Sequence, residues 1–144
     1  MIVLDSFAVL ALLRDEPSAD LVQQLIEGEE DTALTVLGLS EVIDHLVRLM
    51  GAQEEEAVLD LAQLGLALPV PVEVGIGLHA GLLRARHYHR TSRAVSLADC
   101  VAAETARPPG SRLASADPHL LDVCREEGIA VISLPDSSGQ TWAP

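Results

Sequence analysis

The sequence of 144 residues contains no lysine, and only 2% of its residues are aromatic. With so few rings, the core must be filled by Leu, Val, Ile and Ala. Binding of single-stranded nucleic acid by base stacking needs several exposed rings, so the composition argues against that mode. Phosphoacceptor signalling domains place a lysine beside an acidic cluster to hold the phosphoryl group, and the absence of lysine argues against that class too.

Cysteine is also scarce, with only Cys100 and Cys124. Two cysteines within helix-like stretches are too few for a disulfide framework or a zinc knuckle, so we expect reduced, buried thiols in a cytoplasmic protein. The N-terminus lacks a basic segment, and Asp5 interrupts its apolar run, which argues against a signal peptide. The apolar stretch 64–83 is broken by prolines, glycines and Glu73, so no membrane-spanning helix is expected.

Negative charge dominates the chain but is unevenly distributed. The 22 acidic residues outnumber the nine arginines, which gives a formal net charge of −13. Residues 1–73 contain fifteen acidic residues and two arginines, whereas residues 74–144 contain seven of each. The whole imbalance therefore lies in the first half. Such a surface repels nucleic acid unless cations or a local basic strip intervene.

Short apolar segments alternate with amphipathic ones along the chain. This alternation is typical of a parallel sheet with helices on both faces, and the length fits a single domain over 1–144. Turn-forming residues follow the last apolar segment, so 135–144 is expected to be a loosely held tail. The spacing predicts strands over 1–4, 32–37, 112–115 and 129–132, an extended edge piece over 68–72, and helices over 7–13, 17–26, 40–50, 53–65, 75–89, 96–106 and 117–127.

Four acidic residues stand at the ends of expected strands or in the first turns of expected helices: Asp5, Glu41, Asp99 and Asp117. The carboxyl ends of parallel strands share one edge of the sheet, so these side chains are expected to converge on one cleft. Two carboxylates about 5 Å apart repel by roughly 3 kcal/mol at an effective dielectric constant of about 20. A cluster therefore needs protonation or cations, and oxygen ligands favour Mg²⁺ or Mn²⁺ over zinc.

Each acid also has a purely structural explanation as a helix cap. Asp5 precedes a helix, Ser40 and Glu41 read as a cap followed by a first-turn acid, and Asp117 precedes a proline at the first helical position. Ser96 and Asp99 have the spacing of a capping box. The alternative function is therefore a non-catalytic α/β interaction module whose acids are only caps.

The order of these motifs resembles the PIN-domain nucleases, and in detail the VapC-type toxins of prokaryotic toxin–antitoxin modules. The resemblance spans nearly the whole chain and rests on the segments VLDS at 3–6, SEV at 40–42, SLAD at 96–99 and ASAD at 114–117. It implies a three-layer α/β/α fold with a central, mainly parallel sheet. It also implies a metal-dependent endoribonuclease that cleaves RNA phosphodiesters, a cognate antitoxin protein as partner, and a homodimer, for which the apolar helices at 41–50 and 57–66 are the expected interface.

The resemblance also implies a role for each site residue. Asp5, Asp99 and Asp117 are expected to hold one or two Mg²⁺ (or Mn²⁺) ions, and Glu41 either ligates an ion or orients the attacking water. All four acids are thus catalytic candidates. Two small hydroxyl residues, Ser6 and Ser115, match supporting positions of the family.

A basic strip interrupts the acidic chain between Glu73 and Asp99. Arginines at a helix C-terminus complement the helix dipole, which is the structural explanation. The functional explanation is a strip that binds the phosphate backbone of RNA beside an acidic cleft. The strip contains Arg84, Arg86, Arg90 and Arg93.

Overall fold

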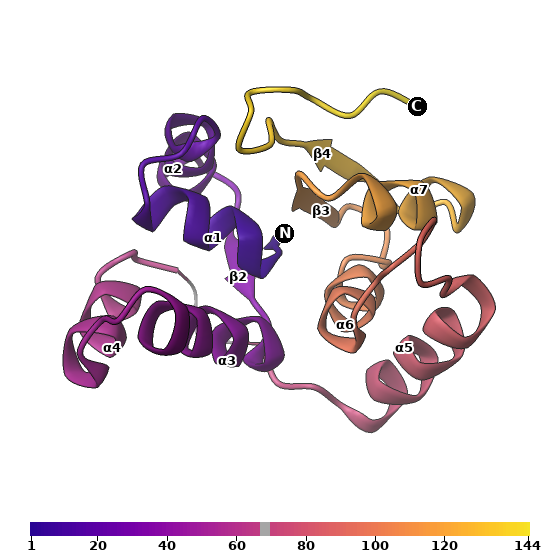
Figure 1. Cartoon of the computed structure of the whole chain (residues 1–144). Helices are drawn as coiled ribbons and strands as arrows, with labels where there is room; N and C mark the ends of the chain where they lie inside the picture. Colours follow the sequence, from indigo (N-terminus) through magenta and orange to yellow (C-terminus); the bar gives the residue numbers. More distant parts are fainter. Residues whose placement is uncertain (67–69) are drawn as a thin grey trace.

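The computed structural model of the chain describes residues 1–66 and 70–144, and its centre is a four-stranded parallel sheet (Figure 1). The strands are β1(Ile2–Leu4), β2(Thr32–Leu34), β3(Arg112–Ser115) and β4(Val131–Ser133). Their order in the sheet is β2-β1-β3-β4, with Val3 paired to Ala33 on one side and to Leu113 on the other. The predicted parallel sheet is confirmed.

Helices cover both faces of the sheet, as the three-layer prediction requires. Alternate residues of a strand point to opposite faces, and β1 shows this directly. Ile2 and Leu4 pack with one buried cluster, whereas Val3 packs with the other. The first cluster includes residues from α1(Ser6–Leu13), α2(Ala19–Glu27), α3(Val36–Asp44) and α4(Glu54–Ala62); the second includes residues from α5(Val74–His87), α6(Leu97–Thr105) and α7(Pro118–Glu126).

Helix α3 begins earlier than the sequence pattern predicts. Thr35 is its N-cap, and the Thr35 hydroxyl accepts a hydrogen bond from the Gly38 backbone N–H at 3.0 Å. Ser40, the predicted cap, instead donates to the Val36 carbonyl at 3.0 Å. The prediction that Glu41 lies in a first turn was therefore wrong, because the strand ends at Leu34 and Thr35 is a competent cap. Residues 45–49 continue the helix as a π-helical turn.

The close fit of α3 over β2 depends on Gly38. A Cβ atom at this position would lie 2.7 Å from the Leu34 side chain. Beyond the helix, Val70 lies beside β2, since its N–H donates to the Leu34 carbonyl at 3.0 Å and its carbonyl accepts from the Val36 N–H at 3.1 Å. Val70 thus occupies the sheet edge expected for 68–72, while Leu68 and Pro69 lie outside the described residues.

Both cysteines are buried in the folded protein, as the sequence analysis expects. Cys100 and Cys124 are free and fully buried, and burial raises the pKa of each thiol to about 12. Both thiols therefore stay protonated at neutral pH.

Within the described ranges, every helix is too short or too polar to cross a lipid bilayer.

Candidate active site

The crevice between the ends of β1 and β3 is where the fold positions its polar residues. These strands are neighbours, yet the chain leaves β1 into α1 on one face and leaves β3 into α7 on the other. Neighbouring parallel strands whose connections diverge leave an opening at their carboxyl ends. Asp5 follows β1 directly, and Asp117 follows β3 by two residues.

A pocket of about 330 Å³ lies at this edge and brings together Asp5, Asp99 and Asp117, which come from three separate parts of the chain. Ser6 also contributes to its wall. The residues that line it are Asp5, Ser6, Phe7, Asp99, Ala116, Asp117, Pro118, Asp136 and Ser137.

Asp5 is the most buried of these acids, with 4% of its surface exposed. One carboxylate oxygen accepts a hydrogen bond from the Ala8 backbone N–H at 2.7 Å, which caps α1. Burial raises the pKa of Asp5 to about 7, and the nearby charges of Asp99 and Asp117 raise it further, against the opposing effect of hydrogen bonds from Ser115 and Ala8. The ionised form of Asp5 therefore lacks sufficient compensation at neutral pH.

Asp99 lies in the first turn of α6 and forms the predicted capping box. Its carboxylate accepts from the Ser96 N–H at 2.7 Å, and its own N–H donates to the Ser96 hydroxyl at 3.0 Å. Burial raises the pKa of Asp99, with further contributions from the charges of Asp117 and Glu41. The cap interpretation is correct for Asp99, but it does not explain why two other acids, Asp117 and Glu41, lie close enough to raise its pKa.

Asp117 is the N-cap of α7, where it accepts from the His119 N–H at 2.9 Å. The Asp117 N–H donates to the hydroxyl of Ser115 at 3.0 Å. Ser115 is fully buried and also contacts the Asp5 carboxylate. It therefore connects the residues that follow β1 and β3.

Glu41 reaches the same region from the middle of α3. Its Oε2 atom accepts a hydrogen bond from the Ser6 hydroxyl at 2.8 Å. Helix α3 packs against both α1 and α6, which explains how its carboxylate influences Asp99. Glu41 does not line the pocket itself, so Ser6 is the residue that links it to the pocket wall.

The donor set suits a hard divalent cation, although the side chains do not already surround one. In residues 1–66 and 70–144, no three His, Cys, Asp or Glu side chains form a ready-made metal site. Carboxylate and hydroxyl oxygens are nonetheless the ligands that Mg²⁺ and Mn²⁺ prefer. A cation would also offset the cost of ionising the buried Asp5 carboxylate.

Three of the four strip arginines are engaged elsewhere in the protein. Arg84 donates to the Val95 carbonyl at 2.9 Å and stacks on the Tyr88 ring at 4.1 Å from its centroid. Arg86 binds Glu127 at 3.1 Å, and Arg93 forms an ion pair with Glu126.

Arg90 differs from these three arginines. It lies exposed in the turn between His89 and Arg93, and it has no ion pair within the described part of the chain. This loop contacts the start of α7, since the Ala94 N–H donates to His119 Nδ1 at 3.0 Å. Arg90 is therefore the strip residue whose guanidinium is available, on a loop that touches the residue two positions after Asp117.

The sequence pattern missed Asp136, which lines the pocket with Ser137. Asp136 follows β4 by three residues, and β4 is the neighbour of β3. The rule that singled out Asp5 and Asp117, an acid just beyond a parallel strand, applies equally to this residue. The expectation of a loosely held tail drew attention away from it.

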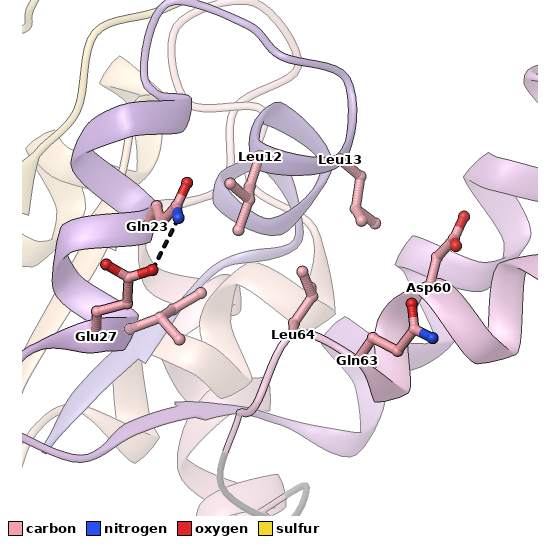
Figure 2. A pocket seen from close by; sticks show the side chains of 8 residues that line it. Leu12, Leu13, Gln23, Glu27, Asp60, Gln63 and Leu64 are labelled. Atoms are coloured by element: carbon pink, nitrogen blue, oxygen red, sulfur yellow. Dashed lines mark hydrogen bonds between the residues drawn. The ribbon is translucent and has the colours of Figure 1, made fainter.

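A second, larger hollow of about 510 Å³ lies among α1, α2 and α4 (Figure 2), and it shares no lining residue with the acidic pocket. Leu12, Leu13 and Leu64 point toward its interior, while Glu27 and Asp60 lie on either side (Figure 2). Glu27 accepts a hydrogen bond from Gln23 at 2.8 Å. An apolar floor with acidic flanks fits a partner segment better than a reacting substrate.

The family model of the PIN domain matches residues 2–132 of the chain. No curated protein matches the sequence. The match includes Asp5, Glu41, Asp99 and Asp117 but ends before Asp136.

Several solved structures share this fold. VapBC2 from Rickettsia felis bound to a DNA fragment from their promoter aligns with a TM-score of 0.68 and 15% identity, over 93% of this chain and 99% of that one. FitAcB from Neisseria gonorrhoeae aligns with a TM-score of 0.66 and 19% identity, over 92% and 96%. FitAB bound to an IR36 DNA fragment aligns with a TM-score of 0.67 and 20% identity, over 92% and 94%. At these identities the likeness establishes a common fold.

Proposed function

Because this chain belongs to the PIN domain family, whose members are nucleases, we propose that it is a divalent-metal-dependent endoribonuclease and the toxin of a type II toxin–antitoxin pair. One observation carries the proposal: Asp5, Asp99 and Asp117 line one pocket, where burial and mutual repulsion raise the pKa of Asp5 to about 7. A buried carboxylate held in this way favours the binding of a positive ion.

In this proposal, Asp5, Asp99 and Asp117 hold Mg²⁺ or Mn²⁺ in the cytoplasm. When bound, the ion lowers the pKa of a coordinated water and offsets negative charge on the phosphate. Glu41, oriented by the Ser6 hydroxyl, accepts a hydrogen bond from the attacking water or contributes a further oxygen ligand. The water oxygen forms a bond to phosphorus as the bond to the leaving oxygen breaks, the proton of the water passes to the Glu41 carboxylate, and the leaving oxygen takes a proton from solvent, so no covalent nucleophile is required.

RNA reaches this acidic pocket along the arginine loop. Arg84, Arg86 and Arg93 hold the loop in place through their contacts with Val95, Glu127 and Glu126. Arg90 then binds a backbone phosphate of the RNA. This division of roles narrows the RNA-contact assignment from the whole strip to one exposed residue.

The hollow among α1, α2 and α4 supports the antitoxin part of the proposal. All three helices lie in the half of the chain that carries the net charge of −13. A partner segment with apolar side chains for the floor and basic side chains for Glu27 and Asp60 fits this surface. The solved complexes of similar fold are toxin–antitoxin pairs, which is consistent with such a partner.

A homodimer is the remaining part of the proposal. Leu49, Met50, Val58 and Leu59 lie in the two segments expected to form its interface, and they are 47–58% exposed. Neighbouring exposed apolar side chains mark an interaction surface. Sedimentation analysis of the wild type and of Leu59→Asp tests this part, and we expect the variant to sediment as a monomer.

The alternative, a non-catalytic interaction module, also has structural support. Asp5 and Asp117 are helix N-caps, and Asp99 completes the capping box of Ser96, as the alternative predicts. Asparagine is as good a helix cap as aspartate but a poor replacement for a metal-binding carboxylate. Substitution of aspartate by asparagine therefore separates the two functions.

The decisive experiment is RNA cleavage by Asp99→Asn in the presence of Mg²⁺ or Mn²⁺. We expect cleavage to fall at least a hundredfold while the melting temperature changes by only a few degrees, because the cap is retained. Asp20→Asn is the matched control, since Asp20 is an exposed first-turn acid of α2. Full activity in Asp99→Asn, or no cleavage by the wild type with either ion, would contradict the proposal.

A further inference from the structure

The chain beyond β4 runs along the same edge of the sheet as the acidic pocket. Ser133 pairs with Ser115 in parallel register, and the Leu134 N–H donates to the Ser115 carbonyl at 2.8 Å. The segments that follow the two strands therefore leave the sheet side by side. One carries Asp117 and the other carries Asp136, and both residues line the pocket.

Asp136 is held in a fixed position by its own turn. One carboxylate oxygen, Oδ1, accepts three hydrogen bonds: from the Ser138 N–H at 2.9 Å, the Ser138 hydroxyl at 2.6 Å and the Gln140 N–H at 2.9 Å. Gly139 completes the turn with a φ of 84°, a conformation that favours glycine. The second oxygen, Oδ2, has no hydrogen-bond partner within the described residues.

The far side of the turn is anchored to α7. The Trp142 indole N–H donates to Asp122 at 3.2 Å, and the Trp142 carbonyl accepts from the Ser133 hydroxyl at 3.1 Å. The Arg125 guanidinium lies 5.8 Å from the centroid of the Trp142 ring. The chain on both sides of Asp136 is thus tied to β3, β4 and α7, which set the walls of the crevice.

We propose that Asp136 is an outer carboxylate of the divalent-cation site, where its Oδ2 atom accepts hydrogen bonds from water bound to the ion. The inference rests on the proposed function, in which Asp5, Asp99 and Asp117 hold that ion. Mg²⁺ keeps several of its waters in proteins, so a site needs acceptors beyond the direct ligands. Asp136 is only half-buried, which suits an outer position better than a direct ligand.

Asp136 is also distinct from the acids that the family match covers. That match ends at residue 132, so this carboxylate is supplied by the tail of the chain. The role assigned to it is positioning, because it acts on the ion through water and not on the phosphate directly.

The test is a titration of the full chain with Mg²⁺ and then Mn²⁺, followed by melting temperature in the absence of RNA. A ligand that binds the native state stabilises it by RT ln(1 + [L]/Kd), so the ion concentration at which the melting temperature begins to rise reports ion affinity. We expect Asp136→Asn to require roughly tenfold more ion than the wild type. Asparagine retains the Oδ1 acceptor, so the turn stays formed while the charge and the second carboxylate oxygen are lost.

Two controls make the result interpretable. Asp20→Asn removes the same charge far from the pocket and should titrate like the wild type, whereas Asp99→Asn removes a direct ligand and should lose the response. If the melting temperature of Asp136→Asn begins to rise at the same ion concentration as that of the wild type, while Asp99→Asn loses the response, this inference is overturned and the proposed function stays intact. No response in the wild type would contradict both.

A second variant separates geometry from charge. Gly139→Ala keeps every carboxylate, and a Cβ there meets no atom within 4 Å, so only the backbone turn is strained. We expect this variant to weaken ion binding severalfold, because Asp136 is then displaced. Wild-type affinity in Gly139→Ala together with weakened affinity in Asp136→Asn would show a charge effect that does not depend on the turn, which contradicts the proposed positioning role.

Discussion

Two groups of carboxylates in this protein lie in opposite electrostatic surroundings, and their pKa values are shifted in opposite directions. In the pocket beyond β1 and β3, acids surround one another, and burial raises the pKa of Asp5 to about 7. Near the ends of α5 and α7, Glu127 is bound by His87, Arg86 and Arg107, and the His87 hydrogen bond is the largest of the effects that lower its pKa to about 2. Glu127 is thus paired with basic side chains, whereas within the described residues the acids of the pocket form no ion pair.

The difference identifies which carboxylates destabilise the native state and which stabilise it. An unpaired buried carboxylate destabilises the native state, and a carboxylate with several cationic partners stabilises it. All arginines of the second group come from the half of the chain with no net charge. The half of the chain without net charge thus supplies the cationic partners of Glu127, while in the proposed function the acidic pocket takes its compensating charge from a bound ion.

The largest expected effect comes from removing the charge of Asp5. Its folded-state pKa is raised from 3.8 to about 7, so its contribution to stability is present below pH 4 and is lost as pH rises through 7. Asp5→Asn should therefore be more stable than the wild type at pH 8 without divalent ions, by roughly 2–4 kcal/mol. Urea unfolding between pH 4 and pH 8 measures this difference.

Divalent ions should reverse that ranking. We expect Mg²⁺ to stabilise the wild type and to leave Asp5→Asn unchanged, because the variant lacks the ligand. If the wild type and Asp5→Asn have the same free energy of unfolding at pH 8 without divalent ions, the buried charge of Asp5 does not destabilise the native state.

The contribution of Glu127 to stability should depend on pH in the opposite sense to that of Asp5. Glu127 has a folded-state pKa lowered from 4.5 to about 2, so its contribution is present above pH 4.5 and is lost as pH falls toward 2. Glu127→Gln should lower the free energy of unfolding by about 2 kcal/mol at pH 7, and the difference should shrink in acid. Glu29→Gln, an exposed acid in a loop, should change it by less than about 0.5 kcal/mol.

The expectation that Asp5, Asp99 and Asp117 come together agrees with the pocket that they line, while their roles stay predictions. Strand ends and helix starts follow from local patterns, and parallel strands bring those points together. The start of α3 was missed because Thr35 and Ser40 are both competent caps, and the length of β2 decides between them.

Long-range pairing was beyond the sequence pattern. The strip arginines are close together in sequence, and only the folded chain shows that Arg86 pairs with Glu127 and Arg93 with Glu126. Asp136 was passed over for a related reason, since its turn depends on contacts with β3 and α7 that turn-forming residues alone do not reveal.

The smallest effect distinguishes Arg90 from its paired neighbours. RNA binding is best measured in the Asp99→Asn background, where the substrate stays intact. Arg90→Ala should weaken binding roughly threefold to tenfold and reduce the salt dependence of log K by about 0.7, the value for one phosphate contact on a single strand. Its stability should change by less than about 0.5 kcal/mol, because no ion pair is lost in the described part of the chain.

Arg86→Ala is the matched variant for Arg90→Ala, since it removes one arginine from the same strip. It breaks the contact with Glu127, so we expect a loss of stability of about 1 kcal/mol and an almost unchanged salt slope. If both variants reduce the salt slope equally, the strip acts as one RNA-binding surface and the pairing with Glu127 exchanges with phosphate. If only Arg86→Ala reduces it, Arg90 has no role in binding RNA, and the division between structural and functional charges fails at this loop.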